Sequence, residues 1–154
     1  MIFWIASYPK SGNTWLRALL SSYYYSKDGF FEQNLLKQIG QFPEKNHFNG
    51  FNYNSQIVTD TSKFWIKAQE IINKDKKLKF FKTHNLLGAI DNNKFTNQQN
   101  SIGAIYVVRD PRNVISSLQN HYELDKEEAL KFMLNEKKFI HNNKLKDDYS
   151  DFQF

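Results

Sequence analysis

The sequence predicts an α/β protein with three layers (α/β/α), in which helices cover both faces of a parallel sheet. Short, continuous apolar runs occupy residues 2–7, 78–83 and 102–108, as expected for strands that are buried on both faces. Helical periodicity separates these runs, and a helix between two strands returns the chain to the same end of the sheet. We therefore expect a single domain over residues 1–154, a length that supports one core and not two.

The first helix is expected over residues 14–24, directly after the first strand. Its predicted core-facing stripe consists of Trp15, Leu16, Leu19, Leu20, Tyr23 and Tyr24. A weaker amphipathic helix is expected at 30–39, followed by a long loop at 40–60 of the kind that often carries function. We expect the aromatic residues at 23–25 and 30–31 to pack in the core or in a lid, and the alternative is that they line an acceptor pocket.

Three further helices are expected in the rest of the chain. One contains Phe64 to Ile72 and follows the helix-start signal Asp60-Thr61-Ser62. Another begins around residues 114–118, directly after the third strand. The last has a capping box formed by Asp125 and Glu128 and is expected to run to Ile140. The first and third strands are thus each followed directly by helical sequence.

The composition excludes several classes of protein. The chain has no cysteine and its four histidines lack metal-ligand spacing, so we expect neither disulfides nor a metal. No apolar run approaches the roughly 18 residues of a membrane span, and residues 2–6 are too short for a signal peptide, so we expect no membrane span and a cytoplasmic location. The net charge of +5 comes mainly from dispersed lysines, which favours a solvated surface over a nucleic-acid partner.

Residues with chemical function lie at the carboxyl end of each predicted strand. The stretch SYPKSGNTW (7–15) follows the first strand, Lys82-Thr83-His84 ends the second, and Arg109 to Arg112 (RDPR) follows the third. Open parallel sheets bind ligands at the carboxyl ends of their strands, which meet at one edge. We therefore expect these three segments to form one site.

The first and third segments are suited to an anionic ligand. Gly12 allows the backbone to approach a ligand, and the N–H groups of Gly12, Asn13 and Thr14 at the start of the helix attract negative charge. The planar guanidinium of Arg109 can bind a phosphate through two hydrogen bonds. Ser117, farther along the following helix, can donate to the same group. The pattern predicts a phosphate site.

The loop differs from the Walker A pattern GxxxxGK[ST], because Lys10 precedes Gly12 and no glycine-rich segment leads into it. Magnesium-dependent hydrolysis of a nucleoside triphosphate is therefore not indicated. His84 can lose a proton near neutral pH and act as a base. Each feature taken alone has a structural explanation: the lysine and glycine can form a simple turn, His84 can be structural, and Arg109 and Asp110 can form a surface ion pair.

Taken together, YPKSGNTW, FFKTH and IYVVRDPRNVISS resemble the amino-terminal signatures of the sulfotransferases that use 3′-phosphoadenosine-5′-phosphosulfate (PAPS). The motifs occur in order, each at the end of a predicted strand. The resemblance implies a P-loop NTPase-like sulfotransferase fold and transfer of a sulfuryl group from PAPS to a hydroxyl or amine, without a metal. It also implies that Lys10 neutralises the bridging oxygen of the leaving group, that Lys82 lies near the sulfuryl group, and that His84 is the base.

The resemblance also implies the residues that hold the donor. The 5′-phosphosulfate and the adenine would be bound by Lys10, Ser11, Gly12, Asn13, Thr14 and Trp15. Arg109 and Ser117 would hold the 3′-phosphate that distinguishes PAPS from ATP. The family often has threonine where this chain has Asn13, a mild change because the position acts largely through its backbone N–H.

The resemblance covers only the amino-terminal half of the family fold. It implies that the carboxyl-terminal portion is absent, including a loop that closes over the 3′-phosphate. The chain would then be a fragment, a truncated product, or a chain that a partner or an oligomer completes. A sheet shortened in this way would expose an edge and an apolar face. Two alternatives stay open: a non-catalytic module that binds PAPS or its product 3′,5′-adenosine bisphosphate (PAP), and a small P-loop nucleotide kinase. The acceptor can be a small molecule, a glycan or a lipid.

Overall fold

The computed structural model describes residues 1–136, 138–141 and 148–153 and contains a parallel sheet of four strands. In spatial order, the strands are β2 (Gly40–Gln41), β3 (Lys79–Thr83), β1 (Ile2–Ser7) and β6 (Ser101–Val107). The central strand β1 pairs in parallel with β3 on one side and with β6 on the other. The predicted parallel α/β sheet is confirmed, and the carboxyl ends of these strands reach the same edge.

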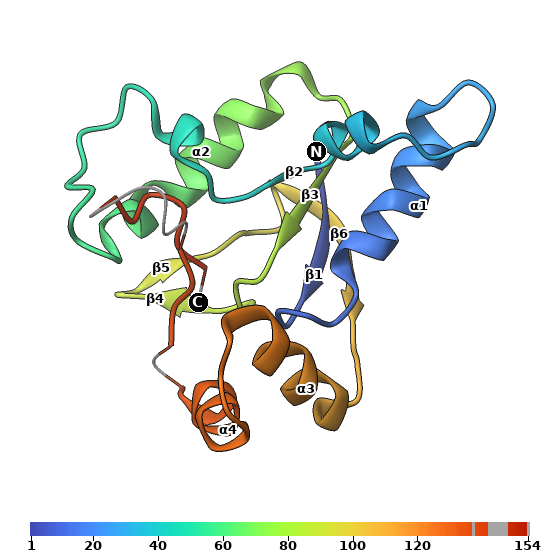
Figure 1. Ribbon diagram of the computed structural model, residues 1–154. Coiled ribbons are helices and arrows are strands. Elements are labelled where there is room, and N and C mark those ends of the chain that lie inside the picture. Colours follow the sequence, from blue (N-terminus) through green and yellow to red (C-terminus); the bar gives the residue numbers. More distant parts are fainter. Residues whose placement is uncertain (137, 142–147, 154) are drawn as a thin grey trace.

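Helices lie on both faces of the sheet, as Figure 1 shows. The α-helices are α1 (Asn13–Tyr25), α2 (Trp65–Ile72), α3 (Pro111–Tyr122) and α4 (Lys126–Leu134). Side chains alternate between the two faces along β1. Ile2 and Trp4 therefore belong to a hydrophobic cluster with Trp65 of α2, whereas Ile5 belongs to a second cluster against which Leu16 of α1 packs. The three-layer α/β/α architecture is confirmed.

The helices α3 and α4 lie together beyond the carboxyl ends of the strands (Figure 1). Asp110 caps α3 by accepting a hydrogen bond from the backbone N–H of Arg112, and Asp125 forms the predicted capping box with Glu128 at the start of α4. The expected extension of α4 to Ile140 was wrong, because α4 ends at Leu134. Ile140 instead forms an antiparallel bridge with a residue near the chain's end, so a tertiary contact overrides the helical pattern.

The predicted core-facing stripe of α1 is only partly correct. Leu16 and Leu20 pack against the sheet, but Trp15, Leu19 and Tyr23 are 78%, 63% and 79% exposed. The exposed residues follow one another at four-residue steps, so they form their own stripe beside the buried one. The aromatic residues at 23–25 and 30–31 are not core residues, because all five are exposed, and their place in a lid stays a prediction.

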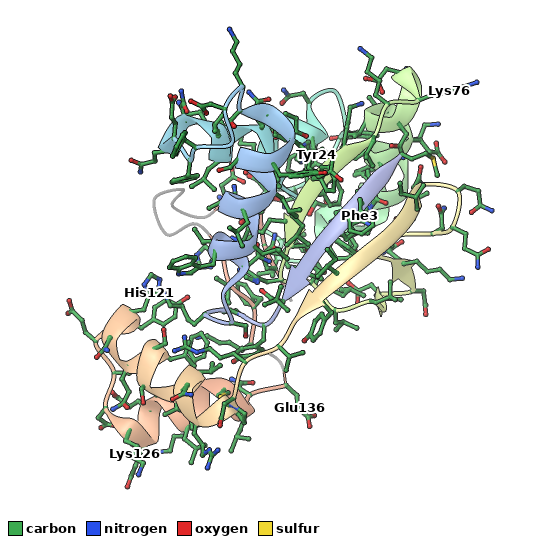
Figure 2. All side chains as sticks on the ribbon, turned by 90° about the vertical axis from the view of Figure 1, so that its right-hand side faces the viewer. Phe3, Tyr24, Lys76, His121, Lys126 and Glu136 are labelled. Atoms are coloured by element: carbon green, nitrogen blue, oxygen red, sulfur yellow. The ribbon has the colours of Figure 1, made fainter. Side chains whose placement is uncertain are left out.

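Near its carboxyl end, α1 contacts the sheet through an aromatic side chain. Figure 2 labels Tyr24 on α1 and Phe3 on the central strand. Both rings contact Phe80 of β3, with centroids 5.0 Å and 5.6 Å away respectively. Tyr24 thus covers the sheet with one side of its ring while the rest of the side chain meets solvent.

The segment between α1 and β3 contains short elements that the sequence does not reveal. The expected helix at 30–39 is only the 3₁₀ turn η1 (Gln33–Gln38), and the expected loop at 40–60 contains the edge strand β2. The remaining 3₁₀ turns are η2 (Lys45–Phe48), η3 (Asp60–Phe64) and η4 (Asn73–Asp75). A strand of two residues has too few side chains for alternation to be visible in the sequence.

A small hairpin precedes β6 and was also not predicted. Its strands are β4 (Ala89–Ile90) and β5 (Asn93–Lys94), which pair antiparallel. The two residues between them, Asp91 and Asn92, have φ angles of 49° and 65°. Positive φ at both positions is typical of a tight hairpin turn, and aspartate and asparagine adopt it more readily than most residues.

The strand β6 forms one edge of the sheet in the described part of the chain. Its side chains Ile102 and Tyr106 are 54% and 64% exposed, so the sheet has the exposed edge and apolar surface that were expected. Among the described residues, no helix combines the length and the apolar character needed to cross a membrane.

Candidate functional site

A cavity of about 940 Å³ opens at the carboxyl ends of β1 and β3. It brings together the three segments that the sequence predicts to converge. The predicted site residues that line it are Lys10, Gly12, Asn13, Thr14, Trp15, Lys82, His84, Arg109 and Ser117. The cavity therefore has cationic side chains from the first, second and third segments on its walls.

The loop after β1 presents backbone N–H groups to this cavity. Lys10 and Gly12 have φ angles of 64° and 105°, which reverse the chain tightly between the strand and α1. No side chain caps the amino terminus of α1, and its first turn contains no acidic residue. The N–H groups at the start of α1 thus keep their donor capacity, and the helix dipole favours an anion there.

Arg109 connects the third segment to the first. Its guanidinium donates a hydrogen bond to the backbone carbonyl of Lys10 at 3.0 Å. The surface ion pair of this loop joins Asp110 to Arg112, at 2.6 Å, and leaves Arg109 to the cavity. Ser117 lines the same cavity from α3. The geometry places a planar cation and a hydroxyl on the wall next to the loop that follows β1.

Lys82 enters the cavity from β3. Its ammonium donates a hydrogen bond to the side-chain oxygen of Gln41 at 2.9 Å, and the two residues are paired in register across β2 and β3. Burial lowers the pKa of Lys82 from its ordinary 10.5 to about 8, and the nearby Arg17 adds to this effect while Glu44 opposes it. At neutral pH Lys82 is still mostly charged.

His84 has one ring nitrogen whose protonation is determined by its partner. Nδ1 lies 2.7 Å from the backbone carbonyl oxygen of Ser7, and a carbonyl can only accept a hydrogen bond. Nδ1 is therefore the protonated nitrogen, and Nε2 carries the lone pair. Burial, with the charge of Lys82, lowers the pKa of His84 from 6.5 to about 4, so the imidazole is neutral at physiological pH. A neutral imidazole with an unprotonated Nε2 is suited to be a general base.

Asn13 points its side chain away from the cavity and toward β1. Its Nδ2 group donates to the carbonyl of Ile5 at 2.9 Å and to the hydroxyl of Ser7 at 3.2 Å. The Ser7 hydroxyl in turn lies 3.3 Å from Nδ1 of His84. The Asn13 side chain therefore supports the end of β1 that orients His84, which leaves its backbone N–H as the group available to a ligand.

A second cavity, of about 580 Å³, lies on the other side of His84. Its walls come from β1, β6, the segment after β3 and the end of α4. The apolar residues that line it include Trp4, Leu86, Leu87, Phe95, Tyr106 and Met133. His84 and Gln153 line both cavities, so the candidate base lies where a cationic cavity and an apolar cavity adjoin.

A comparison with protein-family models matches residues 2–151 to the sulfotransferase domain. This chain belongs to the sulfotransferase family. The match includes the segments at the ends of β1, β3 and β6 and confirms both the resemblance and the P-loop-like fold that it implied. A search of curated proteins and a search of solved structures each found no match.

One residue predicted to bind the donor lies apart from the others. Ser11 is buried and does not line the cavity of about 940 Å³. It lines a smaller cavity of about 270 Å³ between the loop and β6, and its backbone N–H donates to the carbonyl of Tyr8. Its role as a donor ligand stays a prediction.

Trp15, in contrast, is largely exposed at the cavity, so one face of its indole is available to a planar ligand.

Several residues of the sulfotransferase cavity were not singled out by sequence reasoning. They include Gln41, Glu44, Lys45, His121, Tyr122, Asp151 and Gln153. Glu44 precedes η2, and burial raises the pKa of its carboxyl. Figure 2 shows His121 at the far end of α3, below the start of α1. The only sequence signal for Gln41 and Glu44 is their place in the long segment at 40–60, which was expected to carry function. Among the described residues, no cluster of histidine and carboxylate side chains is arranged to hold a metal ion.

Proposed function

We propose that this protein transfers a sulfuryl group from PAPS to the hydroxyl or amine of an acceptor with an apolar body. The observation that carries the proposal is the position of His84. Its unprotonated Nε2 belongs to a ring that lines both a cationic cavity and an apolar one. A base in this position can take a proton from an acceptor on one side while the donor lies on the other.

The residues of the first cavity fit a donor that carries negative charge at both ends. The uncapped start of α1 and the ammonium of Lys10 are suited to the 5′-phosphosulfate. Arg109 and Ser117 are suited to the 3′-phosphate, because a guanidinium binds phosphate through paired hydrogen bonds. The exposed indole of Trp15 offers a stacking surface for adenine.

The proposed reaction needs no group that the chain and its substrates lack. Nε2 of His84 accepts the proton of the acceptor, whose oxygen or nitrogen forms a bond to sulfur as the bond between sulfur and the bridging phosphate oxygen breaks. The leaving group is PAP, and Lys10 with the amides of α1 stabilises the charge that develops on its phosphate. Lys82 lies near enough to His84 to affect its pKa, and its ammonium would neutralise the sulfuryl oxygens.

The second cavity supports an acceptor with an apolar body. Its volume of about 580 Å³ falls in the range of pockets that enclose small molecules. Leu86, Leu87 and Tyr106 line it and are also exposed, so apolar surface extends from the cavity to solvent. A hydroxyl or amine at one end of such an acceptor would meet His84, while its remainder would stay among apolar side chains.

Arg109→Ala is expected to lower the affinity for PAP by about tenfold or more, because the variant loses a charge-assisted contact to the 3′-phosphate. The measurement is calorimetric titration with PAP and, separately, with AMP, which lacks that phosphate. The wild-type protein is expected to bind PAP more tightly than AMP, and the variant is expected to lose this difference.

Arg112→Ala is the matched control, because Arg112 belongs to the same loop and pairs with Asp110 at the surface. It is expected to bind PAP as the wild type does. Weaker AMP binding by the Arg109 variant would reveal damage to the phosphate loop, which Arg109 also contacts. Equal affinity of the wild-type protein for PAP and AMP would refute the assignment of the 3′-phosphate site. PAP binding without transfer to any acceptor would identify the non-catalytic module instead.

Lys82 is expected to limit activity at alkaline pH. Burial favours its neutral amine, so the ammonium is lost as pH rises through about 8 and not through the ordinary 10.5. The kcat/KM for PAPS, which reports the free enzyme, should therefore fall as pH rises above about 8. Lys82→Arg keeps its charge and should remove this fall, even if its rate at neutral pH is lower. An alkaline fall of the same midpoint in both proteins would exclude Lys82 as its origin.

A further inference from the structure

Gln153 lies far from the three motifs in sequence, yet it contacts the residue that carries the proposed base. Its side-chain oxygen Oε1 accepts a hydrogen bond from the backbone N–H of His84 at 2.7 Å and from the hydroxyl of Thr83 at 3.3 Å. Gln153 is only 3% exposed. Neither the sequence motifs nor the family match, which ends at residue 151, assigns a role to this residue.

The backbone N–H of His84 needs such an acceptor because the sheet ends just before it. The last pair between β1 and β3 joins Ala6 to Thr83, and the last pair between β2 and β3 joins Gln41 to Lys82. A backbone N–H that is removed from water and lacks a partner is costly, so native structures pair it. The amide oxygen of Gln153 takes the place of the strand residue that the sheet does not provide.

Gln153 is itself held firmly in this position. Its backbone exchanges two hydrogen bonds with Ile140, at 2.8 Å and 2.7 Å. The preceding residue, Phe152, is fully buried and stacks on Trp65 of α2, with ring centroids 5.4 Å apart. The segment is thus anchored in the core, and the side chain of Gln153 reaches the end of β3 from a fixed point.

We propose that Gln153 is a positioning residue for His84. It holds the backbone at the end of β3, while the carbonyl of Ser7 holds Nδ1 of the ring, and the two contacts together orient Nε2. The inference rests on the proposed function, in which His84 is the base. A base displaced by a fraction of an ångström loses much of its effect on the rate, although the donor still binds normally.

The test compares Gln153→Leu, Gln153→Glu and the control Gln98→Leu, in which an exposed glutamine at the opposite end of the sheet undergoes the same change. Gln153→Leu should leave PAP affinity unchanged and lower kcat roughly 10- to 100-fold, since only orientation is lost. In the same variant, the His84 amide should exchange with solvent faster by NMR. Gln98→Leu should behave as the wild type in each measurement.

Gln153→Glu keeps an oxygen acceptor and adds negative charge near a ring that otherwise faces the cations Lys82 and Arg17. Its carboxylate should preserve the slow exchange of the His84 amide, recover most of kcat at neutral pH, and raise the imidazole pKa, which shifts the acid limb of the pH profile upward. The shift of this limb reports that the side chain at position 153 lies beside the imidazole, and the recovery of kcat reports its positioning role.

Two results would overturn the proposal: a folded Gln153→Leu protein with wild-type kcat, or slow exchange of the His84 amide in that variant. If Gln153→Leu does not fold, fast exchange of the His84 amide or an unchanged imidazole pKa in Gln153→Glu refutes the proposal, and slow amide exchange together with a raised pKa supports it. Amide exchange and the imidazole pKa are measured without substrate. Both measurements therefore test the contact between Gln153 and His84 even if the protein transfers no sulfuryl group. A lack of transfer would count against the proposed function and not against this contact.

Discussion

Replacing His84 by alanine is expected to abolish sulfuryl transfer while PAP binding and the folded state persist. General-base catalysis typically contributes about 10²–10⁴-fold to a rate. Among the described residues, no other histidine lines both cavities. The measurement is steady-state turnover of PAPS with a phenol or alcohol acceptor, beside calorimetric titration with PAP.

His47→Gln is the matched control for the His84 variant. His47 is also partly buried, with a pKa lowered to about 4, but it lies against Phe42 and Phe81 and does not line either cavity. Glutamine keeps an oxygen that can accept the hydrogen bond from the backbone N–H of Glu44. This variant is expected to retain kcat at the cost of some thermal stability. Near-normal turnover by the His84 variant would rule out the base assignment.

Lys10→Ala is expected to reduce kcat by roughly 10²–10³-fold, because a preorganised cation no longer stabilises the charge on the departing phosphate. The loss should fall mainly on kcat, since that charge develops in the transition state. Single-turnover measurements with saturating PAPS separate this effect from weaker donor binding.

The control for Lys10 is Lys45→Ala. Lys45 lines the same cavity, but it forms an ion pair with Asp148 at 2.7 Å and lies away from the phosphate loop. Exposed ion pairs contribute little to stability, so this variant should fold and turn over normally. An equal loss of activity in both variants would mean that the overall positive charge of the cavity matters, and not the position of Lys10.

The sheet and the convergence of the site were predictable because both depend on local signals. Each of the three predicted strands is a short apolar run, and each is followed by polar residues such as Lys10, His84 and Arg109. Parallel pairing then brings the carboxyl ends of the strands together regardless of the loops between them. The motifs thus predicted about half of the residues that line the cavity.

The parts that were missed depend on contacts between distant residues. Gln153 and His84 are 69 positions apart, and nothing around Gln153 marks it as an acceptor for a backbone N–H. Gln41 contacts Lys82 only because β2 adds to the edge of the sheet, and a strand of two residues leaves no pattern. The exposure of Trp15 was equally hidden, because apolar side chains at helical spacing look alike whether they meet the core or solvent.

The hydrogen bond from Arg109 to the carbonyl of Lys10 couples the two ends of the proposed donor site. A guanidinium has five N–H groups, so Arg109 can keep this bond and still grip a phosphate. An anion held by Arg109 would then also steady the turn that receives the opposite end of the nucleotide. Thermodynamic reciprocity requires the converse: occupancy of that turn strengthens the hold on the distal phosphate by the same factor, so the donor's halves bind cooperatively within one molecule.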